Sequence, residues 1–222
     1  MQHLHEKPEP ARFTPEVVVK MGIVFLAVNA AAIAVCVAGA FSSEGYRAFT
    51  EIENTYRCLM AGELFFVLFL WPLYCRWPGA ASVPALGVLL VVSVPLVLVA
   101  AYVSNVPVFM VARTQLLLLA AAGACMAACR LIGRAGGTAW RWYYPVAAAL
   151  AGGLPMVQFI MQDVAGGGAG WLSCASPFWA MELALRPPDS VPRFYWPATL
   201  LFFAILAAAL TAIHPRPRDD AG

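Results

Sequence analysis

The chain has 222 residues, of which 62% are hydrophobic and only 12% are charged. The charged share is about half that of an average soluble domain, which excludes an ordinary water-soluble protein. The net charge of +2, without a cluster of Lys and Arg, excludes a nucleic-acid-binding protein. We expect an all-α polytopic integral membrane protein, because apolar segments of about 20 residues, enough to cross a bilayer, occupy almost the whole length.

Six transmembrane helices are predicted in a single helical domain at 16–214, between polar tails at 1–15 and 215–222. The first helix is expected to begin at Thr14-Pro15-Glu16, a cap residue followed by proline and an acid. Residues 104–107 leave room only for a tight hairpin between the third and fourth spans. The predicted spans are Val17–Phe41, Cys58–Cys75, Val83–Val103, Val108–Cys129, Tyr143–Met161 and Tyr195–Ile213.

The second predicted span carries a carboxylate, Glu63, among apolar residues. An ionised side chain at the bilayer centre costs at least ~2.5 kcal/mol, so such residues usually face a protein interior, a partner or a watery cavity. Two interpretations of Glu63 stay open. It is a substrate or proton site, or its ion pair or hydrogen bond fixes helix packing.

Further polar candidates lie near the outer ends of the fourth and fifth spans. Arg113 is expected to extend to the lipid headgroups, with an ion pair to Glu63 as an alternative hypothesis. Gln158 and Gln162 share one helix face at i, i+4, and together with Glu182 they either line an outward vestibule or meet water and headgroups. The candidate substrate or intramembrane polar residues are Glu63, Arg113, Gln115, Gln158, Gln162 and Glu182.

Catalytic and metal-binding patterns find little support. Cys125 and Cys129 share a helix face, but no His or carboxylate nearby completes a metal set. The three histidines, His3, His5 and His214, lie in the tails, and no His-Glu-x-x-His motif or paired-carboxylate spacing occurs. We therefore expect no metal site, no cofactor and no enzymatic activity.

The connection from Asp163 to Phe194 is the longest one between predicted spans. It opens with a glycine-rich stretch at 166–170 and continues with an apolar stretch from Trp171 to Leu185. This stretch is too short to cross a bilayer, and Pro177 marks a possible helix start. It predicts a short re-entrant or interfacial helix before the last span.

The distribution of Lys and Arg predicts the orientation of the chain. With both termini on one side, that side holds nine of the 14 basic residues, so both termini are predicted to be cytoplasmic. High Ala and Gly content, with Arg preferred over Lys, is typical of GC-rich prokaryotes. A prokaryotic inner (plasma) membrane is therefore the expected location.

The C-terminal third has a recognisable order of features. A Ser176-Pro177-Phe178 turn follows a glycine-containing loop and precedes a short apolar helix, a polar break and a final span with a basic tail. The third predicted span contains Pro95, and the fourth leads into a basic loop at Arg134. Over about residues 85–214 the chain resembles ABC-2 type permeases, the six-span membrane subunits of certain ATP-binding-cassette transporters. The resemblance implies a homodimer or a related permease subunit, and a separate ATP-binding subunit.

The chain has no Gly-x-x-x-x-Gly-Lys-Ser/Thr loop, so ATP hydrolysis is expected on that separate subunit. Permeases of this family commonly carry a charged coupling segment after the second span, whereas residues 75–82 are short and almost uncharged here. We expect a permease-like subunit of an ATP-driven transport complex. A non-catalytic membrane anchor or scaffold subunit of a larger complex is the alternative, and membrane lipids are partners in both cases. The candidate ATPase-docking residues are Arg76, Arg130, Arg134 and Arg141.

Overall fold

The computed structural model describes residues 15–40, 54–75, 83–135, 140–163, 175–186 and 195–212. Within these ranges the regular elements are helices and no strand occurs, which confirms the all-helical prediction. Five helices are long and apolar enough to cross a membrane, and Pro197–Ala212 is a shorter apolar helix. The five are Val18–Cys36, Thr55–Cys75, Ala85–Val103, Val108–Gly133 and Trp140–Met161.

The helix boundaries follow the predicted spans with a few differences. Helix α1 starts at Pro15, as its capping sequence predicts, whereas α6 continues past Cys129 to Ala135. The second and fifth long helices each consist of two α-helical parts joined by a π-helical segment. The elements are α1 (Pro15–Ala40), α3 (Thr55–Phe65), η3 (Phe66–Leu70), α4 (Trp71–Cys75), α5 (Val83–Val103), α6 (Val108–Ala135), α7 (Trp140–Ala148), η4 (Ala149–Gly153), α8 (Leu154–Asp163), α9 (Pro177–Ala184) and α10 (Tyr195–Ala212).

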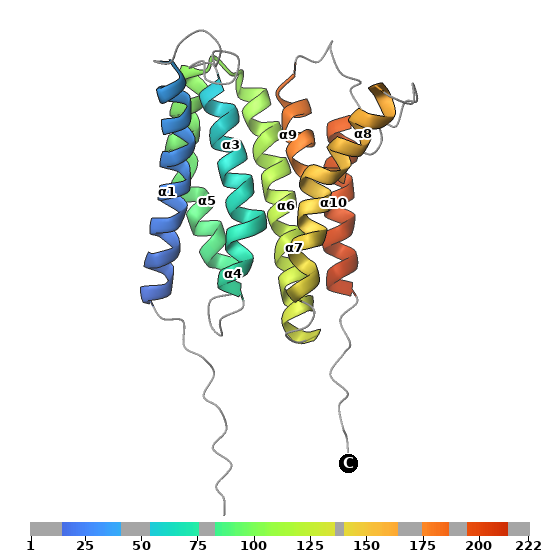
Figure 1. Ribbon diagram of the computed structural model, residues 1–222. Helices are drawn as coiled ribbons and strands as arrows, with labels where there is room; N and C mark the ends of the chain where they lie inside the picture. The colour runs from blue at the N-terminus through green and yellow to red at the C-terminus, as the bar shows by residue number, and fades with distance from the viewer. Residues whose placement is uncertain are drawn as a thin grey trace, which may run out of the picture.

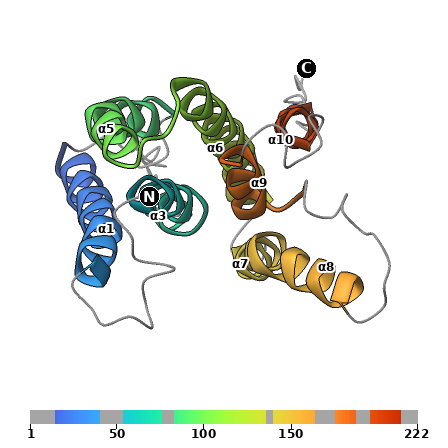
Figure 2. The ribbon, with the colours of Figure 1, turned by 90° about the horizontal axis from the view of Figure 1, so that it is seen from above.

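The helices form one bundle with α6 at its centre (Figure 1). Seen from above, α1, α3 and α5 lie on one side of α6, and α7 to α10 lie on the other (Figure 2). Helix α6 packs against α10, α9, η3 and α3. We call the end with the α5–α6 connection the hairpin end and the opposite end the tail end. Helix α1 begins and α10 finishes at the tail end (Figure 1).

The connection between α5 and α6 is the predicted tight hairpin. Asn105 adopts a left-handed conformation with φ 52°. The Val106 N–H donates to the Ala101 carbonyl at 2.9 Å and the Asn105 N–H to the Tyr102 carbonyl at 3.1 Å. This pair of bonds is a Schellman motif, which satisfies the last carbonyls of α5 and turns the chain directly into α6.

Each π-helical segment ends two residues before a proline, Pro72 after η3 and Pro155 after η4. Proline has no N–H and its ring crowds the preceding turn, so nearby carbonyls lose their helical partner and the turn widens. Side chains from other elements replace the missing donors. The Tyr143 hydroxyl donates to the Leu68 carbonyl at 2.7 Å. The Ser176 hydroxyl donates to the Ala151 carbonyl at 3.1 Å.

Candidate functional site

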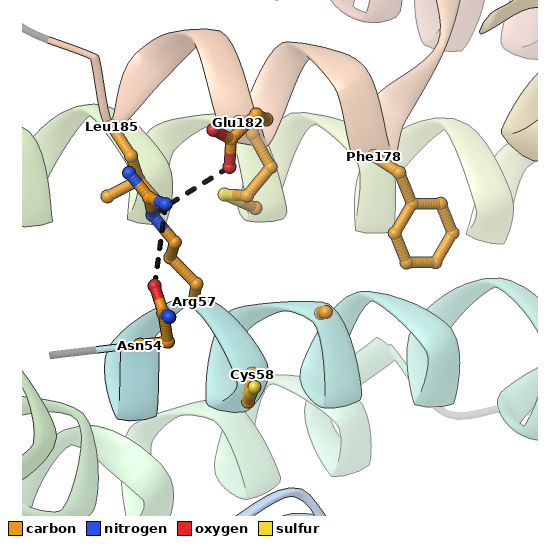
Figure 3. A pocket seen from close by; sticks show the side chains of 8 residues that line it. Asn54, Arg57, Cys58, Phe178, Glu182 and Leu185 are labelled. Carbon is orange, nitrogen blue, oxygen red and sulfur yellow. Dashed lines mark hydrogen bonds and ion pairs between the residues drawn. The ribbon is translucent and has the colours of Figure 1, made fainter. Parts of the chain in front are cut away.

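A cavity of about 350 Å³ lies between α3 and α9. Figure 3 shows its charged rim, where Arg57 of α3 extends toward Glu182 of α9. Apolar side chains of Phe178 and Met181 form part of its wall. The lining residues are Asn54, Arg57, Cys58, Ala61, Phe178, Met181, Glu182 and Leu185.

Three charged side chains lie together at or beside the rim of this cavity. Glu182 lies 3.8 Å from the Arg57 Nε and 3.7 Å from the Arg186 Nε, measured to its carboxylate oxygens. Arg57 also donates to Asn54 Oδ1 at 3.4 Å. Because these groups are half exposed, the ion pairs contribute little stability. Of these three, Arg57 and Glu182 line the cavity, so its described lining carries one positive and one negative side chain.

Helix α9 is positioned by its first residues. The Ser176 hydroxyl accepts the Trp179 N–H at 3.4 Å as an N-cap and also donates to the Ala151 carbonyl, while Pro177 occupies the first helical position. Ala151 lies in the middle of the fifth long helix. The helix then packs against α6, α10 and α3. The Ser176 hydrogen bond therefore joins the start of α9 to a point midway along the fifth long helix, and not to either end of that helix.

A second cavity, of about 330 Å³, lies among α6, α7 and α10. Its walls are almost entirely apolar and include Ala121, Leu150 and Phe203. Pro177 lies on this cavity, whereas the next residue, Phe178, lies on the charged one. The first turn of α9 therefore contributes to the walls of both the apolar cavity and the cavity with the charged rim.

A buried hydrogen-bond network connects α3 to the α5–α6 hairpin. The Tyr56 N–H donates to the Ser104 hydroxyl at 3.0 Å. The Tyr56 and Thr114 hydroxyl oxygens are 2.6 Å apart, and the Thr114 hydroxyl also lies 2.9 Å from the Val111 carbonyl. Since Thr114 can donate to that carbonyl, Tyr56 donates to Thr114. The network fixes the start of the second long helix against the hairpin.

Glu63 is fully buried in α3, with 0% of its surface exposed. Neither carboxylate oxygen accepts a hydrogen bond from any part of the chain that the structure describes. Arg113, the hypothesised partner, lies instead over the Phe109 ring, 5.1 Å from its centroid. The Glu63–Arg113 hypothesis is therefore not supported by the geometry.

The other predicted candidates separate into two groups. Glu182 lies on the charged cavity, and the Gln115 amide donates to Met60 Sδ at 3.3 Å, which links α6 to α3. Gln158 is buried on α8 and does not line that cavity, while the Gln162 side chain lies outside the described residues. Gln158 and Glu182 therefore do not share the lining of that cavity, and the vestibule that includes Gln162 stays a prediction.

The basic candidates for partner docking lie at the tail end as far as they are described. Arg130, in the last turns of α6, and Arg141, in the first turn of α7, are exposed. Arg76 and the Arg134 side chain lie outside the described residues. Near the start of α1, Lys20 pairs with Glu16 at 2.6 Å, and this hydrogen bond and positive charge lower the pKa of the Glu16 carboxyl.

Sequence reasoning missed Arg57 and Asn54 as cavity residues. The predicted second span begins at Cys58, whereas α3 begins at Thr55, so both residues are counted there as part of a loop. An Asn directly before the apolar run is a helix-start signal, and it identifies the earlier start. The contact with α9 has no local signal, because more than 120 residues separate Arg57 from Glu182.

Cys125 contacts the second and fifth long helices. Its sulfur donates to the Val67 carbonyl at 3.2 Å and lies 3.3 Å from the Tyr143 hydroxyl. Within the described ranges, no group of three His, Cys, Asp or Glu side chains is placed to hold a metal ion.

Comparison with protein-family models, with curated proteins and with solved structures finds no match for this chain. Its function is therefore inferred from the geometry of the site.

Proposed function

We propose that this chain is the membrane-spanning, permease-like subunit of an ATP-driven transport complex of ABC-2 type. In this proposal α10 is the sixth span, α9 is a re-entrant helix, and ATP is hydrolysed by a separate subunit. The tail end faces the cytoplasm of a prokaryotic cell, and the hairpin end faces outward. A second copy or a related permease subunit completes the pathway.

The hydrogen bond from Ser176 to the Ala151 carbonyl carries the proposal. It ties the start of α9 to the middle of the fifth long helix, whereas the other end of α9 lies beside Arg57, at the start of α3. A helix in this position lies within the bundle and leads outward, as a re-entrant helix does. An interfacial helix lying on the membrane surface would have no contact with the middle of a span.

The two cavities that meet at α9 support a transport role. One has a charged rim and the other is apolar, and two consecutive residues at the start of α9, Pro177 and Phe178, line one cavity each. A cargo with a charged head and an apolar body fits both environments in succession. Movement of α9 away from Ala151 would join the two cavities.

The test is purification of the tagged chain in mild detergent, with identification of the proteins that accompany it. We expect a stoichiometric ATPase with a Gly-x-x-x-x-Gly-Lys-Ser/Thr loop, and we expect its loss when Arg130, Arg134 and Arg141 are replaced by Gln. Arg57→Gln, at the opposite end of the bundle, is the matched control and should retain the ATPase. A stable assembly without any ATPase would overturn the transporter proposal and favour an anchor or scaffold subunit.

A further inference from the structure

Glu63 belongs to a polar layer in which α1 and α3 lie very close together. A Cβ atom on Gly62 would be 3.2 Å from the Ala32 Cβ, so glycine is what permits this approach. One turn further, the rings of Phe25 and Phe66 are in contact, with centroids 4.9 Å apart. These two contacts bracket Glu63 on α3 and Asn29 on α1, which places both side chains at the same depth.

The side-chain oxygens of Glu63 and Asn29 in this layer are acceptors that lack a donor within the described residues. Asn29 is 1% exposed, and its amide nitrogen donates to the Phe25 carbonyl at 3.0 Å. Its Oδ1 accepts no hydrogen bond, and neither do the two Glu63 oxygens, within the described part of the chain. Ser93 of α5 lies beside the Glu63 carboxyl group, but its hydroxyl hydrogen is already donated to the Leu90 carbonyl at 2.9 Å.

Buried acceptors without donors are unfavourable, and a buried carboxylate without a positive partner is more so. A single proton on Glu63 removes the second problem and reduces the first. It neutralises the carboxyl group and converts one of its oxygens into an O–H donor, which can reach toward Ser93 Oγ or Asn29 Oδ1. A metal ion is a poorer match, because hard cations require about six oxygen ligands.

The neighbouring titratable groups supply no substitute for this proton. The Tyr56 hydroxyl donates to Thr114, and Arg113 lies over Phe109. Lys20 pairs with Glu16 near the start of α1, and Arg57 lies beside Glu182. The remaining titratable side chains described on the elements around the layer are Cys36 of α1, Cys58 of α3, Tyr74 and Cys75 of α4, Tyr102 of α5, and Cys125, Cys129 and Arg130 of α6.

We propose that Glu63, together with Asn29 and Ser93, forms an intramembrane proton-binding site between α1, α3 and α5. The bound proton forms the O–H bond of a neutral Glu63 carboxylic acid. Release breaks this bond, transfers the proton to a water molecule and leaves a carboxylate. Release therefore requires a conformation in which water reaches the layer. Because α1 and α3 close the layer, they must move apart for water to enter, so the rate of proton exchange reports their separation. This inference does not depend on an ATPase partner.

Infrared difference spectroscopy of the purified full chain in lipid nanodiscs tests the proposal without a reagent that must enter the bundle. The wild-type spectrum minus that of Glu63→Gln should contain the C=O stretch of a neutral carboxylic acid at pH 7, shifted in D₂O. Asn29→Leu should shift this band, because it removes one acceptor of the O–H group. Glu182→Gln is the matched control and should leave the band unchanged.

Dicyclohexylcarbodiimide, which reacts with protonated carboxyl groups in apolar surroundings, provides the second readout. Peptide mass spectrometry should find the adduct on Glu63 and not on Glu16 or Glu182, with loss of labelling as the pH is raised. A difference spectrum that contains only carboxylate bands at pH 7 would overturn the proposal, whatever the labelling result. Protection from labelling by Na⁺ at constant pH would also overturn it, since the site would then hold a metal cation.

Discussion

The second and fifth long helices each contain a carbonyl that loses its helical donor near a proline, but the surroundings of the two carbonyls differ. Each has a π-helical segment that ends two residues before a proline, and in each a side chain from elsewhere donates to an orphaned carbonyl. In the second helix the donors, Cys125 and Tyr143, belong to long helices of the bundle. In the fifth helix the donor is Ser176, the cap of the short helix α9.

The two helices also differ in burial. Within the apolar stretch of the second long helix 44% of the residues are buried inside the bundle, against 17% within that of the fifth. The second helix is thus enclosed by α1, α5 and α6, and its π segment is held from two sides. Among the described residues, the side-chain hydroxyl that donates to the π segment of the fifth helix is that of Ser176, directly before α9. The comparison indicates that η3 is held rigidly within the bundle, whereas η4 is released when the Ser176 hydrogen bond breaks.

The largest expected effect on stability comes from replacing one glycine in each of the two helices. Gly62→Leu should destabilise the protein by about 3 kcal/mol, because the added side chain overpacks the contact with Ala32. Gly152→Leu is the matched change in the fifth helix, where nothing lies within 4 Å of a Cβ atom. It should leave stability unchanged or raise it by up to about 1 kcal/mol. Thermal unfolding in detergent measures both, and equal effects would contradict the comparison.

The next effect concerns the donor to the second helix. Tyr143→Phe leaves the Leu68 carbonyl without its hydrogen bond inside the bundle and should cost about 2 kcal/mol. Tyr144→Phe removes the neighbouring hydroxyl as a control and should cost less. In a Pro72→Ala background the restored N–H can bond the Leu68 carbonyl, so the cost of Tyr143→Phe should fall. If the effects of Tyr143→Phe and Pro72→Ala on stability are additive, the two residues do not act on the same Leu68 carbonyl.

A smaller and more local effect is expected at the fifth helix. Ser176→Ala removes an N-cap and the donor to Ala151, and should cost about 1 kcal/mol. Hydrogen exchange should accelerate in α9 while the amides of η3 keep their protection. Ser176→Thr retains a hydroxyl and should restore most of the protection. Equal acceleration of hydrogen exchange in η3 and η4 would mean that the effect of losing the Ser176 hydroxyl is not local.

The smallest effect is expected at the charged rim of the first cavity. Arg57→Gln removes a half-exposed ion pair with Glu182 and should change stability by less than about 1 kcal/mol. The change should shrink further in high salt. A large, salt-independent loss of thermal stability would show that Arg57 has a structural role beyond the rim.

The sequence predicts the helices well where long apolar runs meet clear boundaries. The start of α1 at Pro15, the α5–α6 hairpin and the start of α9 at Pro177 all follow local rules for caps, prolines and turns. The five long helices coincide with predicted spans within a few residues. The sixth predicted span corresponds to the shorter apolar helix α10.

The features that make the site depend on contacts between distant residues. Pro72 and Pro155 are visible in the sequence, but the donors that compensate for them come from helices far along the chain. In the same way, Glu63 is conspicuous in the sequence, whereas its lack of a partner depends on which side chains α1 and α5 place around it. Spacing rules describe one helix at a time and do not specify these neighbours.

The bonds of Tyr56 have a consequence for biogenesis. Its partners Ser104, in the α5–α6 turn, and Thr114, on α6, are synthesised 48 and 58 residues after it. Until α5 and α6 have been synthesised, the first turn of α3 lacks the Ser104 hydroxyl as acceptor for the Tyr56 N–H. We therefore expect the second, third and fourth long helices to leave the translocon as one unit, with the second retained at its lateral gate until the hairpin arrives.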